Sequence, residues 1–511
     1  MAEPPPQGGG AGDPAPGARS VPPAPAVAEA ALIAYSSRAG RYVVLATVLG
    51  AGMALLDSTV VNIALPVIGK DFHASLAGLQ WIATSYLLTL SGLLLLGGSL
   101  GDRFGRRRVF VVGVAWFAAA SALCGLAPDE AVLIGARALQ GVGGALLTPG
   151  SLAIIQSVFV AKDRGRAIGA WTGLSGVASA VGPFLGGWLI AAVSWRLIFF
   201  INLPIALVVV AIATRHVPDT RDPDAPRHLD LEGGSLVTLG LVGTIYALIE
   251  GPGSGWGSPP VLAALLLGVA CLTGFIVVEL RHPHPLVPLQ LFSSRAFSAT
   301  NVVTFLVYGA LGGGLFLLPV QLEQVAGYSP LAAGASLLPL TAMMLLLAAR
   351  FGALSSRIGP RLQMSVGPVI AGAGLIALVH LGAGGDYVTE VLPSMLLFGL
   401  GMSLTVAPLT ATVLAATPAR YTGIASAVNN DVARLASLVA VAVLPAVAGL
   451  EGDAYLHPAR FSRGFHLAMV LSGVLCAAGG LVSALTITNP PRAAPAGAAG
   501  ARGEAGAGAS A

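Results

Sequence analysis

The sequence predicts an all-α integral membrane protein, built as two bundles of six transmembrane helices with two more helices inserted between them. Three observations lead to this fold class. The 511 residues are 55% hydrophobic and only 10% charged, with a mean hydropathy of +0.82, which excludes a soluble globular protein. Fourteen apolar segments are each long enough to cross a bilayer, which takes about 20 residues. A short basic sequence between two of these segments returns in the second half of the chain.

The repeated sequence is GSLGDRFGRRR at 98–108, and its altered copy is GALSSRIGPRL at 352–362. Internal repeats of this kind are how many secondary transporters are built. Asp102 becomes Ser356 in the copy, so we expect the two loops to act differently. Four residues recur 254 positions later: Gly98 as Gly352, Arg103 as Arg357, Gly105 as Gly359 and Arg107 as Arg361.

The apolar segments divide into six, two and six, because the seventh and eighth lie between the repeat copies. The expected spans are 43–66, 79–99, 109–127, 131–157, 166–190, 197–214, 233–250, 260–280, 297–322, 331–350, 363–383, 390–415, 421–448 and 465–487. We therefore expect a six-helix bundle over 43–215, an inserted hairpin with linkers over 216–290, and a second bundle over 291–489.

Residues 1–42 and 490–511 are rich in proline, glycine and alanine, and we expect disordered cytoplasmic tails there. The net charge of +4 is small, so no nucleic-acid partner is expected. Cys124, Cys271 and Cys476 lie inside apolar spans, which favours neither a disulfide framework nor a metal site.

Loop charges predict the orientation. Loops after even-numbered spans are rich in arginine, whereas those after odd-numbered spans are mostly acidic or uncharged. The last external loop, with Arg460 and Arg463, departs from this pattern. The positive-inside rule then places both termini in the cytoplasm of a cell that carries the protein in its plasma membrane.

Two charged residues inside spans are the first candidates for function, because each costs about 2.5–3.5 kcal/mol on insertion scales. Asp57 lies about 14 residues into the first span, roughly 21 Å from its cytoplasmic end. Arg137 lies about six residues into the fourth span, roughly 9 Å from the outer face. In a core of about 30 Å these depths coincide, so the two side chains are able to pair. Two readings remain open: the pair is broken by a proton or cationic substrate, or it only holds two helices together.

A second set lies on the thirteenth span, where Asp431 and Arg434 are three residues apart and share a helix face with Asn430. This pair either takes part in substrate or proton binding or closes on itself as a local salt bridge. Asn62 in the first span completes the candidates for coupling or substrate binding. Glu279, Glu323 and Arg350 stand at span ends, where we expect them to extend towards the headgroups without a functional role.

The fifth span carries GPFLGG, with Gly182, Pro183, Gly186 and Gly187. Small residues let helices approach closely, and a proline within a helix adds a kink. We expect a pliable helix at the interface between the two halves.

Together these motifs resemble the major facilitator superfamily, in particular its fourteen-span drug:proton antiporters of the EmrB/QacA type. The resemblance covers roughly 42–488. It rests on LDSTVVNIALP (56–66), GSLGDRFGRRR (98–108), RALQGVGGA (137–145), GPFLGG (182–187) and WRLIFFINLP (195–204).

The resemblance implies a major facilitator fold and roles for the motif residues. Arg137 would take part in proton transfer and Asp57 in coupling or cation recognition, while Gly182 with Pro183 would prevent leak. The loop residues would form a gate latch: Gly98, Asp102, Arg103, Gly105, Arg106 and Arg107. The family's antiporter motif usually starts with glycine where Ala178 stands, and the tenth span has no acidic residue, which disfavours a dicationic substrate.

We therefore expect proton-coupled efflux of drugs, antibiotics or other amphipathic molecules by a monomer that is no enzyme. No phosphate-binding G-x-x-x-x-G-K-[ST] sequence occurs, so the proton gradient, with no cofactor, is the expected energy source. One alternative is a dedicated exporter of one endogenous metabolite or siderophore, and another is a receptor or non-exporting permease. A remote alternative is an intramembrane serine hydrolase using Ser175 and His380.

Overall fold

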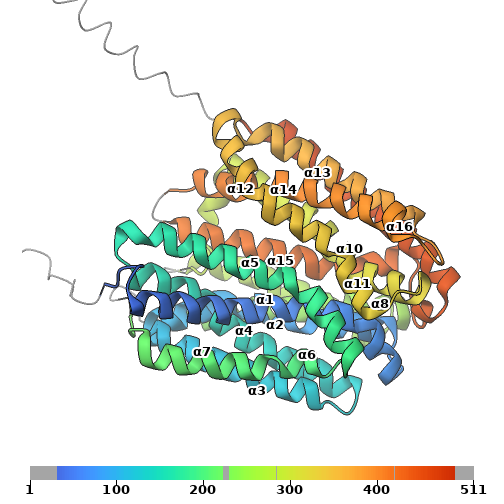
Figure 1. The fold of residues 1–511 in the computed structure, drawn as a ribbon, viewed down its shortest axis with the longest axis horizontal. Coiled ribbons are helices and arrows are strands. Elements are labelled where there is room, and N and C mark those ends of the chain that lie inside the picture. Colours follow the sequence, from blue (N-terminus) through green and yellow to red (C-terminus); the bar gives the residue numbers. More distant parts are fainter. Residues whose placement is uncertain (1–31, 223–228, 283–284, 419–420, 490–511) are drawn as a thin grey trace, which may run out of the picture.

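The structure is a computed structural model that describes residues 32–222, 229–282, 285–418 and 421–489. Fourteen of its helices are long and apolar enough to cross a membrane, as predicted. Figure 1 shows the first half of the chain, coloured blue to green, packed along the second half, coloured yellow to red. The predicted tails at 1–31 and 490–511 lie outside the described residues.

The first half contains six spans, the sixth of which is formed by two short helices in succession. They are α1 (Arg38–Phe72), α2 (Leu76–Phe104), α3 (Arg106–Leu126), α4 (Glu130–Val158), α5 (Ala161–Ala192), α6 (Leu197–Phe200) and α7 (Asn202–His216). Most run past the apolar segments at both ends.

The inserted hairpin and the second half follow. The hairpin is α8 (Leu231–Ser254) and α9 (Pro259–Arg281), and the short 3-10 helix η2 (Leu289–Ser293) comes next. The second half is α10 (Arg295–Val320) with η3 (Gln321–Val325), α11 (Pro330–Ser336), α12 (Leu338–Ile358), α13 (Pro360–Ala377) with η4 (Leu378–His380), η5 (Tyr387–Val391), α14 (Leu392–Ala415), α15 (Thr422–Val447), η7 (Ala454–Leu456) and α16 (Pro458–Thr486).

Side-chain caps fix where several helices begin. The hydroxyl oxygen of Ser75 accepts a hydrogen bond from the backbone N–H of Gly78 at the start of α2, and the carboxylate of Asp129 does the same for α4. Each cap satisfies a backbone donor that has no partner within the helix. Short capped turns between long helices make consecutive spans antiparallel neighbours.

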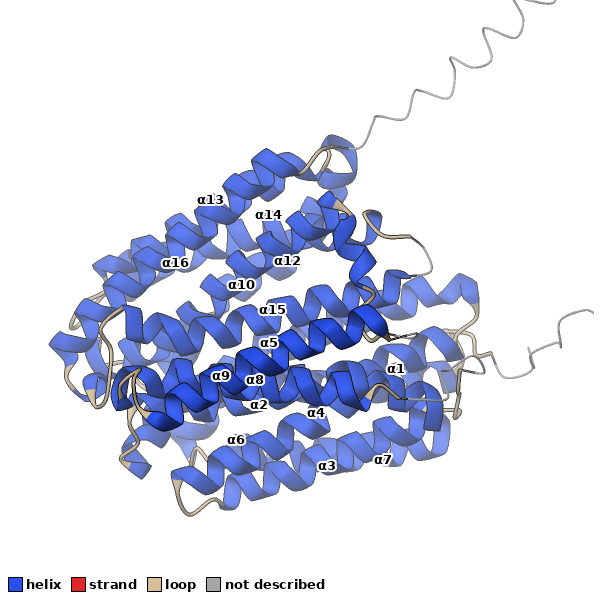
Figure 2. Cartoon of the chain, turned by 180° about the vertical axis from the view of Figure 1, so that it is seen from behind, coloured by secondary structure: helices blue, strands red, loops and turns tan. Residues whose placement is uncertain are grey.

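The hairpin lies against both halves. Helix α8 packs against α2 of the first half and α15 of the second, and α9 packs on α8. Figure 2 shows α8 and α9 in front of α2 in this view. The two inserted helices therefore cover one side of the boundary between the halves. On another side of that boundary, α5 packs against α11 and α12.

Two predicted boundaries are wrong. Residues 32–42 are not a disordered tail: α1 begins at Arg38, and the N–H of Tyr35 donates to the Asp163 carboxylate at 2.9 Å. Helix α16 begins at Pro458, so Arg460 and Arg463 belong to its first turns rather than to an external loop. Proline suits the first turn of a helix, so α16 is able to begin at Pro458. The first turns of α16 are polar, and the span was predicted from hydropathy, so the prediction left these turns out.

Candidate functional site

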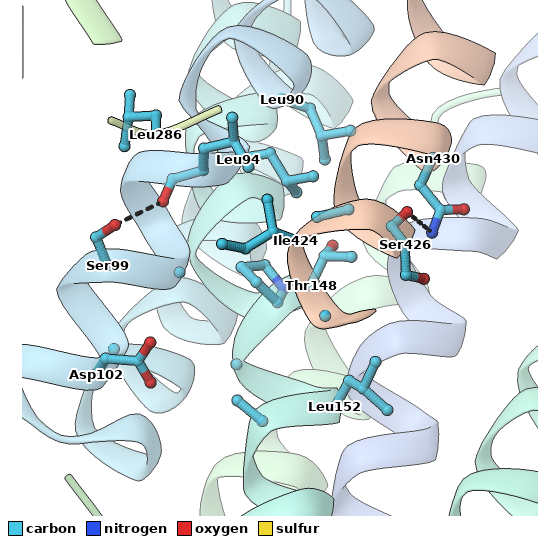
Figure 3. A pocket seen from close by; sticks show the side chains of 18 of the residues that line it. Leu90, Leu94, Ser99, Asp102, Thr148, Leu152, Leu286, Ile424, Ser426 and Asn430 are labelled. Carbon is cyan, nitrogen blue, oxygen red and sulfur yellow. Dashed lines mark hydrogen bonds between the residues drawn. The ribbon is translucent and has the colours of Figure 1, made fainter. Parts of the chain in front are cut away.

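A cavity of about 1650 Å³ lies between the two halves. Figure 3 shows Leu94, Asp102 and Thr148 of the first half and Ile424 and Asn430 of the second around it. We call the end of the bundle with the α2–α3 and α12–α13 loops the arginine end. The lining includes residues from the segments after α7 and after α9, which lie at that end. Among the described residues, none of the lining comes from loops at the opposite end. The cavity is therefore accessible from the arginine end.

The predicted pairing of Asp57 with Arg137 is confirmed. Arg137 Nη1 lies 2.5 Å from Asp57 Oδ2, and both side chains are buried, with at most 1% exposed. An ion pair with so little water is stable only if its remaining hydrogen-bonding atoms are satisfied. The depths estimated from the sequence thus placed two charges from α1 and α4 at the same level.

Three neutral side chains complete this polar site, which we call the Asp57 cluster: Asp57, Ser121, Arg137, Gln140 and Asn202. Gln140 Nε2 donates to Asp57 Oδ1 at 2.8 Å and to the Ser121 hydroxyl at 2.7 Å. Asn202 Nδ2 donates to the same two oxygens, each at 3.2 Å, while its own Oδ1 has no partner among the described residues. Side chains from four helices of the first half, α1, α3, α4 and α7, thus form one hydrogen-bonded network around the ion pair.

Tyr86 separates the Asp57 cluster from the cavity. Its ring lines the cavity, and the guanidinium carbon of Arg137 lies 4.6 Å from the ring centre. The Tyr86 hydroxyl donates to the Ala54 carbonyl oxygen at 3.3 Å, and Ala54 lines the cavity as well. A cation over an aromatic face is attracted to it, so Arg137 and Tyr86 hold each other in place. Neither Asp57 nor Arg137 lines the cavity itself.

The second predicted pair is a loose one. Arg434 Nη1 lies 3.9 Å from Asp431 Oδ1, too far for a hydrogen bond, and neither atom has another partner among the described residues. Arg434 lines the cavity, as does Asn430, whose amide donates to the Ser426 carbonyl oxygen (Figure 3). Asn62 is half-buried on α1 and is not part of the Asp57 cluster. On α15, then, a cavity-facing arginine remains incompletely paired.

The GSLGDRFGRRR loop is held together inside the first half. Arg106 Nη2 lies 2.7 Å from Asp102, which joins the end of α2 to the start of α3. Arg107 donates to the Val217 carbonyl oxygen at 3.1 Å, and Arg108 pairs with Asp219 at 2.9 Å. The segment after α7 therefore lies along this loop. Arg103 is exposed, with its guanidinium 5.2 Å from the Phe104 ring centre, and a Cβ added at Gly98 would meet Pro149 at an ordinary contact distance.

The second copy of the loop is bound in the same way, which supports the duplication predicted from the sequence. Arg361, the counterpart of Arg107, donates to the Ala484 carbonyl oxygen at 2.8 Å, near the end of the last helix of its own half. Asn489 accepts from the Arg361 N–H at 3.1 Å and donates to the Ile358 carbonyl oxygen at 3.2 Å. The copy lacks the carboxylate of Asp102, so the Asp102–Arg106 ion pair is specific to the first half.

Gly105 and Gly359 are equivalent positions where only glycine fits. Their φ angles are +114° and +87°, and a Cβ would overlap the side chain of Asp219 or Asn489. We expect Gly105→Ala to lower the free energy of unfolding by about 1–3 kcal/mol, the cost of a side chain in such a conformation. The melting temperature of the purified protein measures this. Gly165→Ala, with open space on a regular helix, is the matched control; equal effects of the two would contradict the argument.

The glycines of α5 lie where the sequence predicts, at the boundary between the halves. A Cβ on Gly182 or Gly186 would overlap Thr59 or Val60 of α1. A Cβ on Gly187 would overlap the backbone at Pro330, where α11 of the second half begins. Pro183 contacts the same helix, because its carbonyl oxygen lies against Gly334. Helix α5 thus packs closely on both halves.

Hydrogen bonds close the boundary between the halves at the end opposite the arginine loops. The Tyr455 hydroxyl, from η7 of the second half, donates to the Ala74 carbonyl oxygen at 2.6 Å. The N–H of Leu76 donates to the Gly452 carbonyl oxygen at 2.8 Å. Gln80 extends the contact along α2 by donating to the Val441 carbonyl oxygen at 2.7 Å. Sequence reasoning missed these contacts, because each of them ends on a backbone carbonyl oxygen and none joins two charged side chains.

The Ser175 and His380 of the hydrolase alternative are not brought together. Ser175 is buried on α5, and its hydroxyl has no partner among the described residues. His380 ends the short helix η4 in the second half. A serine nucleophile needs a base within hydrogen-bond reach, and no described residue supplies one to Ser175.

Two helical halves around a cavity that is accessible at one end define the class of this protein: a multi-pass membrane transporter. The comparison with known families makes this specific. The Major Facilitator Superfamily profile matches residues 47–442, and the chain belongs to that superfamily.

Its relatives include antibiotic resistance proteins. The chain is 37% identical to the tetracenomycin C resistance and export protein of Streptomyces glaucescens, over 80% of this chain and 76% of that one. It is 38% identical to the puromycin resistance protein of Streptomyces alboniger, over 82% and 83%. It is 34% identical to the methylenomycin A resistance protein of Bacillus subtilis, over 82% and 90%.

Solved structures confirm the fold. A bacterial homologue of the human lysosomal transporter Spinster, described as inward-facing and unoccupied, superimposes with a TM-score of 0.64 at 18% identity and covers 88% of this chain and 97% of that one. A peptide transporter solved with sulfate gives a TM-score of 0.62 at 18% identity, over 89% and 98%. At these identities the likeness concerns the major facilitator fold alone.

Proposed function

We propose that this protein exports drugs, antibiotics or other amphipathic small molecules from the cell in exchange for protons. Alternating access of the cavity to the two sides of the plasma membrane would carry the substrate across. The observation that carries this proposal is a cavity accessible at one end only, with a buried, fully paired Asp57 carboxylate behind its wall. Relatives named for resistance to single antibiotics support the substrate class.

The positive-inside rule would place the arginine end and both termini in the cytoplasm. The cavity then opens towards the cytoplasm, where an exporter collects its substrate. Its walls combine leucines such as Leu90 and Leu94 with polar and charged side chains, which suits amphipathic molecules. In this proposal the protein acts as a monomer and a transporter, without enzymatic activity or a bound cofactor.

Coupling would act through Tyr86. A proton on Asp57 weakens its hold on Arg137, and Arg137 contacts the Tyr86 ring that lines the cavity. Substrate bound against Tyr86 and a proton bound to Asp57 would thus compete, because both act on the guanidinium of Arg137. The energy suffices, because a proton crossing about 150 mV supplies about 3.5 kcal/mol, enough for a gradient of roughly 300-fold.

The Asp102–Arg106 loop would keep the arginine end of the first half rigid while the two halves move. It joins α2 to α3 and, through Asp219, to the segment after α7, so these elements would move as one body. The contacts of α5 with α11 and of Tyr455 with Ala74 would have to break when the cavity opens to the outside.

Dye accumulation in cells without other major efflux pumps tests the proposal. Cells that produce the protein should accumulate less ethidium, a fluorescent amphipathic cation, than cells with an empty vector, and an uncoupler should remove the difference. Equal accumulation in both would overturn broad multidrug export. Export of a single compound would then be the function to pursue, since several relatives are each named for one antibiotic.

A further inference from the structure

The inserted hairpin contributes one wall of the cavity at the arginine end. Helix α8 begins there after Asp230, and α9 ends there at Arg281. Asp230, Glu279 and Leu280 line the cavity together with Leu286 from the loop that follows α9 (Figure 3 shows Leu286). This wall belongs to neither six-helix half, and the Asp57 cluster does not include it.

Glu279 does not extend into the headgroups, as expected from its position at a span end. Its side chain is only 3% exposed. Oε2 accepts a hydrogen bond from the N–H of Val287 at 3.3 Å, which ties the chain after α9 back onto the helix. The other oxygen, Oε1, is buried without a hydrogen-bond partner among the described residues.

Asp230, which caps the other helix of the hairpin, is likewise buried and has one carboxylate oxygen without a partner among the described residues. It is 5% exposed, and its Oδ1 caps α8 by accepting from the N–H of Gly233 at 2.7 Å. Its Oδ2 has no partner within the described part of the chain. Each of the two carboxylates therefore has one oxygen that is used for the fold and one oxygen that is buried without a hydrogen-bond partner among the described residues.

Among the described residues no lysine or arginine pairs with either carboxylate, and His282, which follows the end of α9 and lines the same cavity, is the basic side chain that attracts the charge of Glu279. Arg106, which also lines the cavity, is held by Asp102, and Arg434 on α15 lies beside Asp431. A buried carboxylate without a cation is costly, so a positive group that arrives there is bound favourably. The free carbonyl groups at the C-terminal end of α9 add negative potential near Glu279.

We propose that Glu279 and Asp230 form a cation-recognition subsite, which takes the ammonium or other positive group of an amphipathic organic substrate. The subsite rests on the proposed export function and names the charge of its substrates. The apolar body of the molecule would lie against Leu280, Leu286 and Ile424, which line the same cavity. The hairpin is then a part of the binding site as well as a cover for the boundary between the halves.

Fluorescence titration of the purified protein with two dyes tests the subsite: ethidium, a monocation, and Nile red, a neutral apolar dye. We expect Glu279→Gln and Asp230→Asn to bind ethidium at least about tenfold more weakly, as when a buried charge loses its partner. Affinity for Nile red should stay within about twofold. Both variants keep the oxygen that accepts from Val287 or Gly233, so the fold is retained.

Glu232→Gln is the matched control, because Glu232 is an exposed acid in the first turn of α8. Unchanged ethidium affinity in Glu279→Gln, or an equal loss for both dyes, would overturn the subsite. Glu279-dependent ethidium binding by a wild-type protein that does not export the dye would uphold the subsite and overturn broad multidrug export. Export of ethidium that is unaffected by Glu279→Gln would overturn the subsite and support the proposed export function.

Discussion

Asp57→Asn is expected to abolish uncoupler-sensitive efflux. The change removes the titratable group and leaves Arg137 buried with no charged partner, since its other contacts are the Gln140 amide, a carbonyl oxygen and two aromatic rings. An uncompensated buried charge costs roughly 3–5 kcal/mol, so the variant should also be less stable. Initial efflux rates of a dye, normalised to the amount of folded protein, measure the first effect.

A double variant separates coupling from a purely static role. Asp57→Asn combined with Arg137→Gln removes both charges and retains polar side chains towards Gln140 and Asn202. If the pair only holds α1 and α4 together, the double variant should recover both stability and efflux. We expect it to recover stability, measured as a higher melting temperature than Asp57→Asn alone, while efflux remains absent. Recovery of uncoupler-sensitive efflux would contradict a coupling role.

Gly187→Val is expected to have the second largest effect on efflux. It changes the contact between α5 and α11, which lies where the boundary between the halves is closed, at the end opposite the arginine end. A side chain there overlaps the backbone of Pro330 and Leu331 only while α5 and α11 are packed together. Overpacking costs about 1–3 kcal/mol, which shifts the population towards the state open at this end by roughly 5- to 150-fold. Efflux should fall accordingly, because closure at this end becomes rare.

Spin labels at Val193, at the end of α5, and Val388, in η5, measure this shift, since both side chains are exposed at the closed end on different halves. We expect longer label-to-label distances in Gly187→Val than in the wild type. Gly176→Val is the control, because a Cβ at Gly176 on the same helix meets open space. Identical distance distributions in all three proteins would refute the argument.

The number of spans and the Asp57–Arg137 pair were predictable for the same physical reason. Hydrocarbon penalises polar atoms strongly, so long apolar segments and charges within them stand out in the sequence. A depth estimate from a rise of about 1.5 Å per residue was enough to bring two charges together. Gln140 and Asn202 were not predictable, because neutral polar residues in helices are common and their depth does not reveal what they face.

Glu279 shows where reasoning from the sequence ends. A position near a span end indicates access to the headgroups, but it does not say whether the side chain faces lipid or a cavity wall. That depends on how the hairpin is rotated against α2 and α15, which is a matter of packing between segments far apart in the chain. The closing contacts of Tyr455 depend on loop conformation in the same way.

Exchange driven by an imposed pH gradient in proteoliposomes tests the central claim most directly. Wild-type protein should move ethidium against its own gradient when protons flow the opposite way, and dissipating the pH gradient should stop this. The Asp57→Asn/Arg137→Gln variant should show no uphill movement at equal reconstitution. Uphill movement in that variant, or wild-type transport that ignores the pH gradient, would contradict proton exchange through the Asp57 cluster.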